Sequence, residues 1–557
     1  MPLQSPTKSP AKKREEELEK KLQEIQTKEH AEEYSARANK FGLPFSTLKG
    51  VPIDTEALNI LSEEESRKSN LAVLYKNENK LIIALLDPEN PDTKETINSL
   101  KEKKFILDLL ITTPDILNSV LERYKIIKQK VFKVGAIQID ETELAQLQDQ
   151  IKNLSDLQNK LASMSVTKLL EILIAGALKT EASDIHFEPE SADARLRYRL
   201  DGILHDITKI EVAYYEKILN RVKVLSKMKL NIHDAPQDGR FTIKQKSVDI
   251  EVRVSILPSE FDETIVMRLL DPRTIKATLE ELGMRKDLME LVKKELTKKT
   301  GAIMTSGPTG AGKTTTLYAF VNHLNEPGNK IITIEDPIEY HVKNISQTQV
   351  EPKKGYTFAN GLRAIVRQDP NIILVGEIRD AETAEIALQS ALTGHLVLST
   401  IHTNDAAGVV PRLINLGIRA QIIAPAINIT IAQRLVRKLC LNCREKVKAS
   451  PEILQKIKTA LDPIKDRVDI KSLNQGLEIY KPNKCDQCNS SGYRGRLGIF
   501  EAFVVSKNIE ELILTSPSVS SIKAMALAEG MITILQDAYL KLIDGVTSME
   551  EIDRVVS

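Results

Sequence analysis

The sequence predicts a multidomain α/β protein whose C-terminal half is built on a parallel β-sheet with helices on both faces. The chain has 557 residues, which is more than one hydrophobic core usually organises. After residue 276, short β-branched segments alternate with helical segments, as they do in parallel sheets covered on both sides. Hydrophobic residues make up 42% of the chain and charged residues 28%, which is ordinary for globular protein. We therefore expect about three folded domains joined by linkers.

Composition and charge argue against several classes of protein. No apolar segment approaches the ~20 residues that a membrane-spanning helix needs, and the N-terminal segment has lysines without the apolar stretch of a secretory signal. The 78 basic and 77 acidic side chains leave a formal net charge of +1, without the positive excess that favours nucleic-acid binding. We expect a soluble protein that stays in the cytoplasm and does not bind nucleic acid.

The N-terminal third divides into three segments. Residues 1–40 are rich in Pro, Ser, Lys and Glu and predict a disordered leader that passes into a charged helix, or alternatively a coiled-coil partner helix. Residues 41–125 contain strand-like apolar segments at 71–75 and 80–88, which predict a small α/β domain. The polar, helix-prone segment 126–163 predicts a linker helix.

Residues 164–275 predict a second α/β domain. The segment ARLRYRLDG alternates apolar side chains with arginines, which predicts a strand with one apolar and one basic face. The apolar residues of this segment are Leu196, Tyr198 and Leu200, and the arginines are Arg195, Arg197 and Arg199. Helices are expected at 166–179 and 213–227, and further strands at 240–245, 248–257 and 263–271.

Residues 276–557 carry the alternation of strands and helices. The expected strands are AIMTSG, IITIED, NIILVGE and LVLSTI, and the expected helices are 313–325, 358–368 and 381–392. Ligands bind at the carboxyl ends of the strands in such sheets.

The sharpest motif is GPTGAGKT at 307–314, which fits the phosphate-binding loop G-x-x-x-x-G-K-[ST] and lies between an expected strand and an expected helix. Backbone N–H groups of such a loop surround the β-phosphate, and the following helix N-terminus adds a favourable dipole. We predict that Lys313 supplies charge to the β- and γ-phosphates of ATP and that Thr314 ligates Mg²⁺. The alternative is a glycine-rich turn that binds no nucleotide. The predicted nucleotide-binding residues are Gly307, Pro308, Thr309, Gly310, Ala311, Gly312, Lys313, Thr314 and Thr315.

Acidic residues follow two of the other strands. Glu377 ends NIILVGE, where P-loop ATPases carry an acidic group beside the metal, and Gly376 replaces the usual Asp. Glu335, Asp336 and Glu339 come at the end of the strand IITIE. Hydrolysis needs a carboxylate that orients or deprotonates water, so one of these glutamates is the candidate base. The alternative is that Asp336 and Glu339 only cap a turn.

Histidines and arginines give weaker signals. His395 and His402 bracket the strand LVLST and face opposite sides of an ideal strand, and each is either a residue near phosphate or a hydrogen-bonded core residue. With a P-loop, arginines suggest fingers supplied across a subunit boundary, although surface arginines are more often solvated or ion-paired. The arginines in places that favour an anion are Arg240, Arg253, Arg268, Arg363, Arg367 and Arg379.

All four cysteines fall in two C-x-x-C pairs, Cys440 with Cys443 and Cys485 with Cys488. Two thiolate pairs can complete a tetrahedral Cys₄ zinc site, and the intervening length predicts an inserted loop. The alternatives are redox-active pairs or core thiols without metal. A redox pair would normally open a helix in a thioredoxin-like βαβ unit, and that setting is missing here.

From about residue 164 to 555 the chain resembles the GspE/PilB family, the hexameric motors of type II secretion and type IV pilus extension. The resemblance implies a RecA-like P-loop NTPase core at 276–557, a PAS-like α/β domain before it at 164–275, and a small Cys₄ zinc subdomain at about 438–497. The segments that carry it are SDIHFEP at 183–189, RLRYRLDG at 195–202, PQDGR at 236–240, GPTGAGKTTTLY, TIEDPIEY, ILVGEIRD, TGHLVLSTIHTND and the paired C-x-x-C motifs.

The resemblance also implies roles for individual residues. Glu339 would be the catalytic glutamate and Glu377 the Walker B glutamate near Mg²⁺, whereas the two histidines would sense nucleotide. Two arginines of the preceding domain, Arg240 and Arg253, would reach phosphate after that domain rotates. The complete catalytic set is then Glu339, Glu377, Lys313, Arg240, Arg253, His395 and His402.

At the level of function, the resemblance implies a homo-hexameric ATPase that uses ATP, Mg²⁺ and Zn²⁺ and acts on an inner-membrane platform protein. The cysteines indicate pilus extension or secretion, because the related retraction motors lack the tetracysteine element. Residues 41–125 lack the long RLG-containing motif with which some members bind cyclic di-GMP, so we do not expect that ligand. The alternatives are a nucleic-acid translocase or helicase-like ring ATPase and a nucleotide-gated scaffold with negligible turnover.

Overall fold

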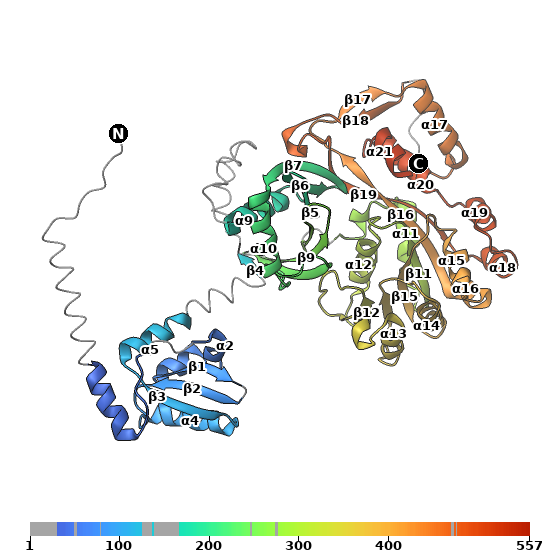
Figure 1. The fold of residues 1–557 in the computed structure, drawn as a ribbon. Helices are drawn as coiled ribbons and strands as arrows, with labels where there is room; N and C mark the ends of the chain where they lie inside the picture. Colours follow the sequence, from blue (N-terminus) through green and yellow to red (C-terminus); the bar gives the residue numbers. More distant parts are fainter. Residues whose placement is uncertain are drawn as a thin grey trace, which may run out of the picture. The chain divides into compact units, whose positions relative to one another are not determined.

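The computed structural model describes residues 30–48, 53–77, 79–124, 136–138, 166–245, 248–272, 277–468, 473–474 and 476–556. The chain forms two compact units, residues 1–137 and 138–557, which are described separately (Figure 1). Within the described ranges, every helix is too short or too polar to span a bilayer.

The first unit contains a small three-stranded sheet in the order β1-β2-β3. Strands β1 and β2 pair antiparallel and β2 and β3 parallel. Helices cover both faces of the sheet, so β1 is buried on both sides. Its elements are a helix at 30–41, α2 (Thr55–Leu58), α3 (Glu63–Lys68), β1 (Leu71–Asn77), β2 (Lys80–Leu85), α4 (Pro91–Glu102), β3 (Ile106–Ile111) and α5 (Pro114–Leu121).

Two expectations for the N-terminal third fall largely outside the described residues. Of the predicted leader, the structure describes only residues 30–40, which are helical and bury Ala38 in the core of the first unit. Of the predicted linker helix, it describes only β4 (Ala136–Gln138), which is a strand.

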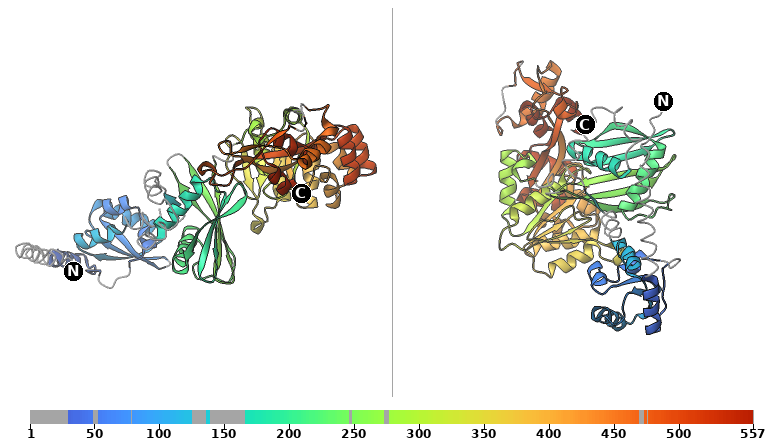
Figure 2. Two further views of the ribbon diagram at one scale, coloured as in Figure 1. Left: turned by 90° about the horizontal axis from the view of Figure 1, so that it is seen from above. Right: turned by 90° about the vertical axis from the view of Figure 1, so that its left-hand side faces the viewer.

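The second unit begins with a sheet whose strands pair antiparallel in the order β8-β9-β10-β5-β6-β7. Helices α9 and α10 pack on one face (Figures 1 and 2), and the hydroxyl of Tyr198 on β6 donates to Leu173 O of α9. The predicted two-faced strand is present: Leu196 and Tyr198 are buried, whereas the alternating arginines are only half-buried. The elements are α9 (Val166–Lys179), β5 (Asp184–Pro189), β6 (Asp193–Leu200), β7 (Ile203–Glu211), α10 (Val212–Leu225), β8 (Gln237–Lys244), β9 (Asp249–Pro258) and β10 (Glu263–Leu270).

The larger sheet of the second unit has the order β13-β12-β14-β15-β11-β16-β19. All neighbours pair parallel except β19, which runs antiparallel to β16. The elements up to β16 are α11 (Lys286–Leu296), β11 (Gly301–Ser306), α12 (Lys313–Leu324), β12 (Ile331–Glu335), β13 (Ser346–Gln349), α13 (Phe358–Val366), β14 (Ile372–Val375), α14 (Ala381–Leu392), β15 (Leu396–Ile401), α15 (Val409–Asn415), α16 (Ala420–Ala426) and β16 (Ile427–Leu439).

Beyond β16 lies a small two-stranded sheet of β17 and β18, followed by β19 and four helices. Figure 1 shows β17, β18 and α17 grouped beyond one end of the long β16 and β19 strands. These elements are β17 (Glu445–Lys448), α17 (Pro451–Leu461), β18 (Glu478–Lys481), β19 (Tyr493–Val504), α18 (Lys507–Thr515), α19 (Val519–Ala528), α20 (Ile534–Ile543) and α21 (Met549–Val556).

Two apolar cores lie on opposite faces of the larger sheet, because successive side chains of its strands point to opposite sides. On β11, Met304 belongs to the core formed with α13 to α16, and Ile303 to the core formed with α11 and α12. The prediction of a parallel sheet with helices on both faces, preceded by another α/β domain, is therefore confirmed.

Candidate functional site

The loop at 307–312 connects β11 to α12 and is shaped by glycines. Gly307, Gly310 and Gly312 have φ values of +145°, +80° and +86°, a region that residues with side chains rarely adopt. Gly312 is the N-cap residue of α12, and no side chain caps this helix. The first N–H groups of α12 are therefore available to an anion, as in phosphate-binding loops.

Lys313 is the first residue of α12, and its ammonium group lies inside the loop. Its Nζ donates to Gly307 O over 2.7 Å and to Pro308 O over 3.0 Å. Burial lowers the pKa of Lys313, and the carboxylate of Glu377 opposes that shift. The positive charge is thus held where the loop would wrap phosphate groups.

Glu377 lies just after β14, at the carboxyl edge of the larger sheet. Its side chain is 14% exposed, pairs with Arg379 Nη2 and lies 3.6 Å from His402 Nε2. His402 follows β15, and the P-loop follows β11. Three loops at the ends of adjacent parallel strands therefore bring Lys313, Glu377 and His402 to one edge.

The structure distinguishes the two glutamates that follow β12. Glu335 is 3% exposed, and its carboxylate accepts hydrogen bonds from the Tyr318 and Thr333 hydroxyls and the Gln347 amide. Burial raises the pKa of Glu335, although these hydrogen bonds oppose the shift. Glu339 is more accessible, with a side chain 30% exposed, so of the two it is better placed to orient water.

Glu339 is bonded to an arginine from the antiparallel sheet. Arg253 on β9 donates from Nη1 to Glu339 Oε2 over 3.1 Å and from Nη2 to Ile338 O over 2.8 Å. A cleft of about 630 Å³ adjoins this contact and is lined by Arg240, Arg253 and Arg268 among others. Arg240 is 74% exposed and lies 4.0 Å from Glu251, and Arg268 pairs with Asp184, so of these three arginines it is Arg253 that bonds to Glu339.

His395 lies at the other end of β15 from His402. It precedes the strand, its Nδ1 is 3.0 Å from Ser390 O, and its carbonyl accepts from Gly301 N at the start of β11. The structure therefore brings His402 to the edge that carries the P-loop and places His395 at the opposite edge. A role for His395 in nucleotide sensing stays a prediction.

The four cysteines form a compact cluster in which all Sγ atoms lie within 4.8 Å of one another. Neighbouring Sγ atoms are 3.6 to 3.8 Å apart, and a tetrahedral zinc site with Zn–S bonds of about 2.3 Å spaces its sulfurs about 3.8 Å apart. The donor set and its spacing fit Zn²⁺, with Cys440, Cys443, Cys485 and Cys488 as ligands.

Ionisation of the cluster differs between its members. Burial and hydrogen bonds among the neighbouring thiols raise the pKa of Cys443 to about 12. Burial also disfavours the Cys488 thiolate, but backbone hydrogen bonds at Cys485 and Gly492 outweigh it and lower its pKa to about 7. Four crowded thiolates need a compensating cation, which a bound Zn²⁺ would supply.

Comparison with known proteins places this site in a family. Residues 159–554 match the family model described as Type II/IV secretion system protein, and residues 41–127 match the MshEN domain model. The chain belongs to the Type II/IV secretion system protein family. It is an ATPase of that family.

Its relatives include proteins of two kinds of machine. The chain is 33% identical over 522 residues to the type IV pilus assembly ATPase PilB of Myxococcus xanthus, covering 92% of this chain and 89% of that protein. It is 40% identical over 409 residues to the type II secretion system protein E of Dickeya dadantii, covering 73% of this chain and 79% of that protein.

A solved structure supports the fold. The X-ray structure of the Legionella pneumophila ATPase DotB matches with a TM-score of 0.51 and 20% identity, covering 70% of this chain and 95% of that one. The predicted resemblance to the GspE/PilB family is confirmed, and the MshEN match gives the small N-terminal domain a family that sequence reasoning did not identify. The expectation that this domain does not bind cyclic di-GMP stays a prediction.

Sequence reasoning missed two residues that shape the site of this ATPase. Tyr318 on α12 binds the Glu335 carboxylate, and Gln433 on β16 contacts Thr316 in the first turn of α12. Tyr318 ends the segment GPTGAGKTTTLY and Gln433 lies outside the quoted motifs, but the motif patterns do not indicate either contact, because each joins two different elements.

Proposed function

We propose that the chain is a homo-hexameric motor that hydrolyses ATP at the cytoplasmic face of a membrane and powers assembly of a type IV pilus or a type II secretion pseudopilus. Its partner would be the membrane-embedded platform protein of that machine. The names of the relatives support both machines, and the cysteine cluster supports assembly over retraction.

The contact between Arg253 and Glu339 carries this proposal. It joins the antiparallel sheet to the segment that follows β12, so the position of one sheet relative to the other controls the state of the candidate base. An arginine that pairs with Glu339 before hydrolysis can turn to the γ-phosphate when ATP binds, and the carboxylate is then released to orient water. A motor needs this kind of coupling between domain position and chemistry.

The remaining residues have separate roles in the proposed reaction. The loop of residues 307–312 and Lys313 would hold the phosphates of ATP, while Thr314 and Glu377 would hold Mg²⁺, which neutralises charge on the phosphates. His402, through its contact with Glu377, would respond to whether ATP and Mg²⁺ occupy this edge of the sheet. Arg240, on the rim of the cleft, would reach phosphate only after the two sheets shift.

The test compares the wild-type chain with Glu339→Gln, in which the amide keeps the shape of the side chain but cannot accept a proton. We expect the wild type to elute at the mass of six chains and to hydrolyse ATP with Mg²⁺. The variant should bind ATP and assemble normally but turn over roughly 10² to 10⁴ times more slowly, measured as steady-state phosphate release.

One result would contradict the assignment of the base, and another would contradict the motor proposal. Full activity of Glu339→Gln would transfer the role of the base to Glu377. Hydrolysis that rises strongly with added DNA would favour a nucleic-acid translocase over a pilus or secretion motor.

A further inference from the structure

Gln433 lies on β16 directly beside the start of the P-loop. Strands β11 and β16 pair parallel, with Ser306 opposite Ala432. The next residues of the two strands, Gly307 and Gln433, therefore also lie side by side. The Gln433 side chain is 2% exposed, and the hydroxyl of Thr316 donates to its Oε1 over 2.6 Å. A buried hydrogen bond therefore joins β16 to the first turn of α12.

Two glycines of the P-loop pack against this same glutamine. A Cβ added at Gly307 would lie 2.5 Å from Gln433 O, and one added at Gly312 would lie 2.9 Å from Gln433 Nε2. The contact at Gly307 is with backbone and excludes a side chain there, whereas the contact at Gly312 is with the end of the Gln433 side chain. The backbone of Gln433 thus lies against the start of the loop, and its side-chain amide lies against the end of the loop and bonds to the helix that follows.

We propose that Gln433 is a positioning residue that holds the P-loop and the first turn of α12 in their phosphate-binding conformation. Donor groups that are already fixed need no rearrangement when an anion binds. The inference rests on the proposed role of this loop in binding ATP. It adds Gln433, which lies outside the motif, to the residues on which ATP binding depends.

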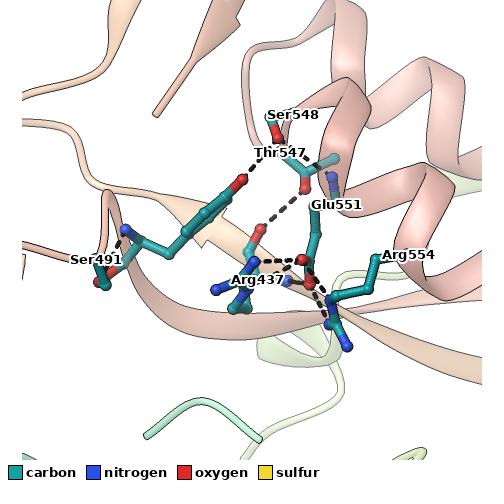
Figure 3. Close-up of polar contacts among 7 residues, drawn as sticks. Arg437, Ser491, Thr547, Ser548, Glu551 and Arg554 are labelled. Carbon is teal, nitrogen blue, oxygen red and sulfur yellow. Dashed lines mark hydrogen bonds and ion pairs between the residues drawn. The ribbon is translucent and has the colours of Figure 1, made fainter. Parts of the chain in front are cut away.

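The far end of β16 is anchored through Arg437 (Figure 3). Arg437 donates from Nε and Nη2 to Glu551 Oε2 over 2.9 and 2.7 Å, and Glu551 is fully buried. The guanidinium also lies 3.9 Å from the centre of the Tyr493 ring, and the Thr547 hydroxyl donates to Arg437 O. Four residues beyond Gln433, the strand is therefore fixed to α21 and β19.

The experiment measures the affinity of the full chain for ADP by calorimetry, in the wild type, Gln433→Ala and Thr316→Val. We expect each single variant to weaken ADP binding about tenfold, which corresponds to about 1.4 kcal/mol and is of the size expected for one buried hydrogen bond. The double variant should bind about as weakly as either single one, because both remove the same contact. Thr316→Ser keeps the hydroxyl and should therefore bind ADP with the affinity of the wild type.

Thr430→Val is the matched control. Thr430 lies on the same strand and is fully buried, but its hydroxyl has no hydrogen-bond partner among the described residues. This variant should bind ADP like the wild type. If Gln433→Ala and Thr316→Val lower thermal stability but leave ADP affinity unchanged, Gln433 is only a structural residue and the inference is overturned.

Lys313→Ala separates this inference from the proposal on which it rests. If Lys313→Ala loses ADP binding while Gln433→Ala and Thr316→Val keep it, the P-loop binds nucleotide and Gln433 does not position it. If Lys313→Ala keeps full affinity, the P-loop role itself fails and the role of Gln433 fails with it.

Discussion

Arg253 makes two different hydrogen bonds with one guanidinium group, to the Glu339 carboxylate and to the Ile338 carbonyl. Lysine can replace the charge but not the planar arrangement of donors. We expect Arg253→Lys to retain part of the ATP turnover and Arg253→Ala to lose more of it, by roughly 10-fold to 10³-fold, measured as kcat with saturating Mg-ATP.

A surface variant controls for the loss of a positive charge. Lys293 forms an exposed pair with Glu280 and is not one of the site residues, so Lys293→Ala should keep the wild-type kcat. If Arg253→Ala also keeps it, the Arg253–Glu339 contact has no part in the reaction.

Some of the site residues could be predicted from the sequence, and others could not. The P-loop could be predicted because one short segment supplies the glycines, the lysine and the helix start. The residue pattern alone did not distinguish Glu335 from Glu339, and only the family resemblance selected Glu339. Both follow one strand, and the difference depends on Tyr318, Gln347 and Arg253, which come from other elements. For the histidines, strand alternation predicted opposite faces, whereas the decisive difference is that they lie at opposite ends of β15.

At the scale of elements, the attachment of α21 to β16 depends on a buried carboxylate. Burial opposes ionisation of Glu551, but hydrogen bonds from Arg554 and Arg437 outweigh it and lower its pKa. A group whose pKa is lower in the folded state stabilises that state above its unfolded pKa of about 4.3, and the benefit is lost as the pH falls through the folded pKa.

Glu551→Gln should therefore lower the free energy of unfolding at pH 7 by about 3 kcal/mol, because it leaves the largely buried guanidinium of Arg437, whose side chain is 14% exposed, without its charged partner. The difference from wild type should shrink at pH values below 4. Urea unfolding at both pH values measures this, and a difference that is equal at both would show that the charge of Glu551 contributes nothing.

The cysteine cluster makes a second prediction at this scale. Cys443→Ser removes one of four thiolates, so the zinc content should fall from about one ion per chain to well below that value, as measured by metal analysis. Chelation of the wild type should lower its thermal stability. ADP affinity should change little, because the P-loop contacts none of the cysteines. If the purified wild type holds no zinc and chelators leave its stability unchanged, the site is not a zinc site.

Individual elements of the second unit followed from periodicity and loop residues. The helix expected at 381–392 is α14, and the helix expected at 213–227 is α10, which begins and ends slightly earlier. Strand β8 begins at Gln237, three residues before the expected start, because Gln237 and Asp238 pair with β9 despite their polar character. Hydrophobic patterns therefore located the strands but missed polar ends that pairing extends.

At the scale of the whole molecule, the two compact units make separate contributions. Every residue of the proposed nucleotide site lies in residues 138–557, which contain their own apolar cores. A chain that begins at residue 138 should bind ADP with the affinity of the full chain, measured by calorimetry. Weaker binding by more than about tenfold would show that the N-terminal unit contributes to the site.

The contacts between the two sheets of the second unit were not predictable from composition. The predicted boundary at residue 275 separates two sheets, but the contact between Arg253 and Glu339 and the bond from Gly495 N to Asp201 Oδ2 join these sheets into one unit. Such contacts depend on which surfaces meet in three dimensions, and a pattern along the chain does not encode them directly.

The pairing of Leu439 with Tyr493 has a consequence for how the metal is captured. The chain leaves the larger sheet at Leu439, just before Cys440, and returns to it at Tyr493, just after Cys488. Strand pairing therefore holds the two ends of the long intervening loop together, and the conformational entropy of closing this loop is lost when the chain folds. A free peptide with the same cysteines would lose that entropy only when it bound zinc. The folded chain should therefore bind the ion more tightly than the peptide.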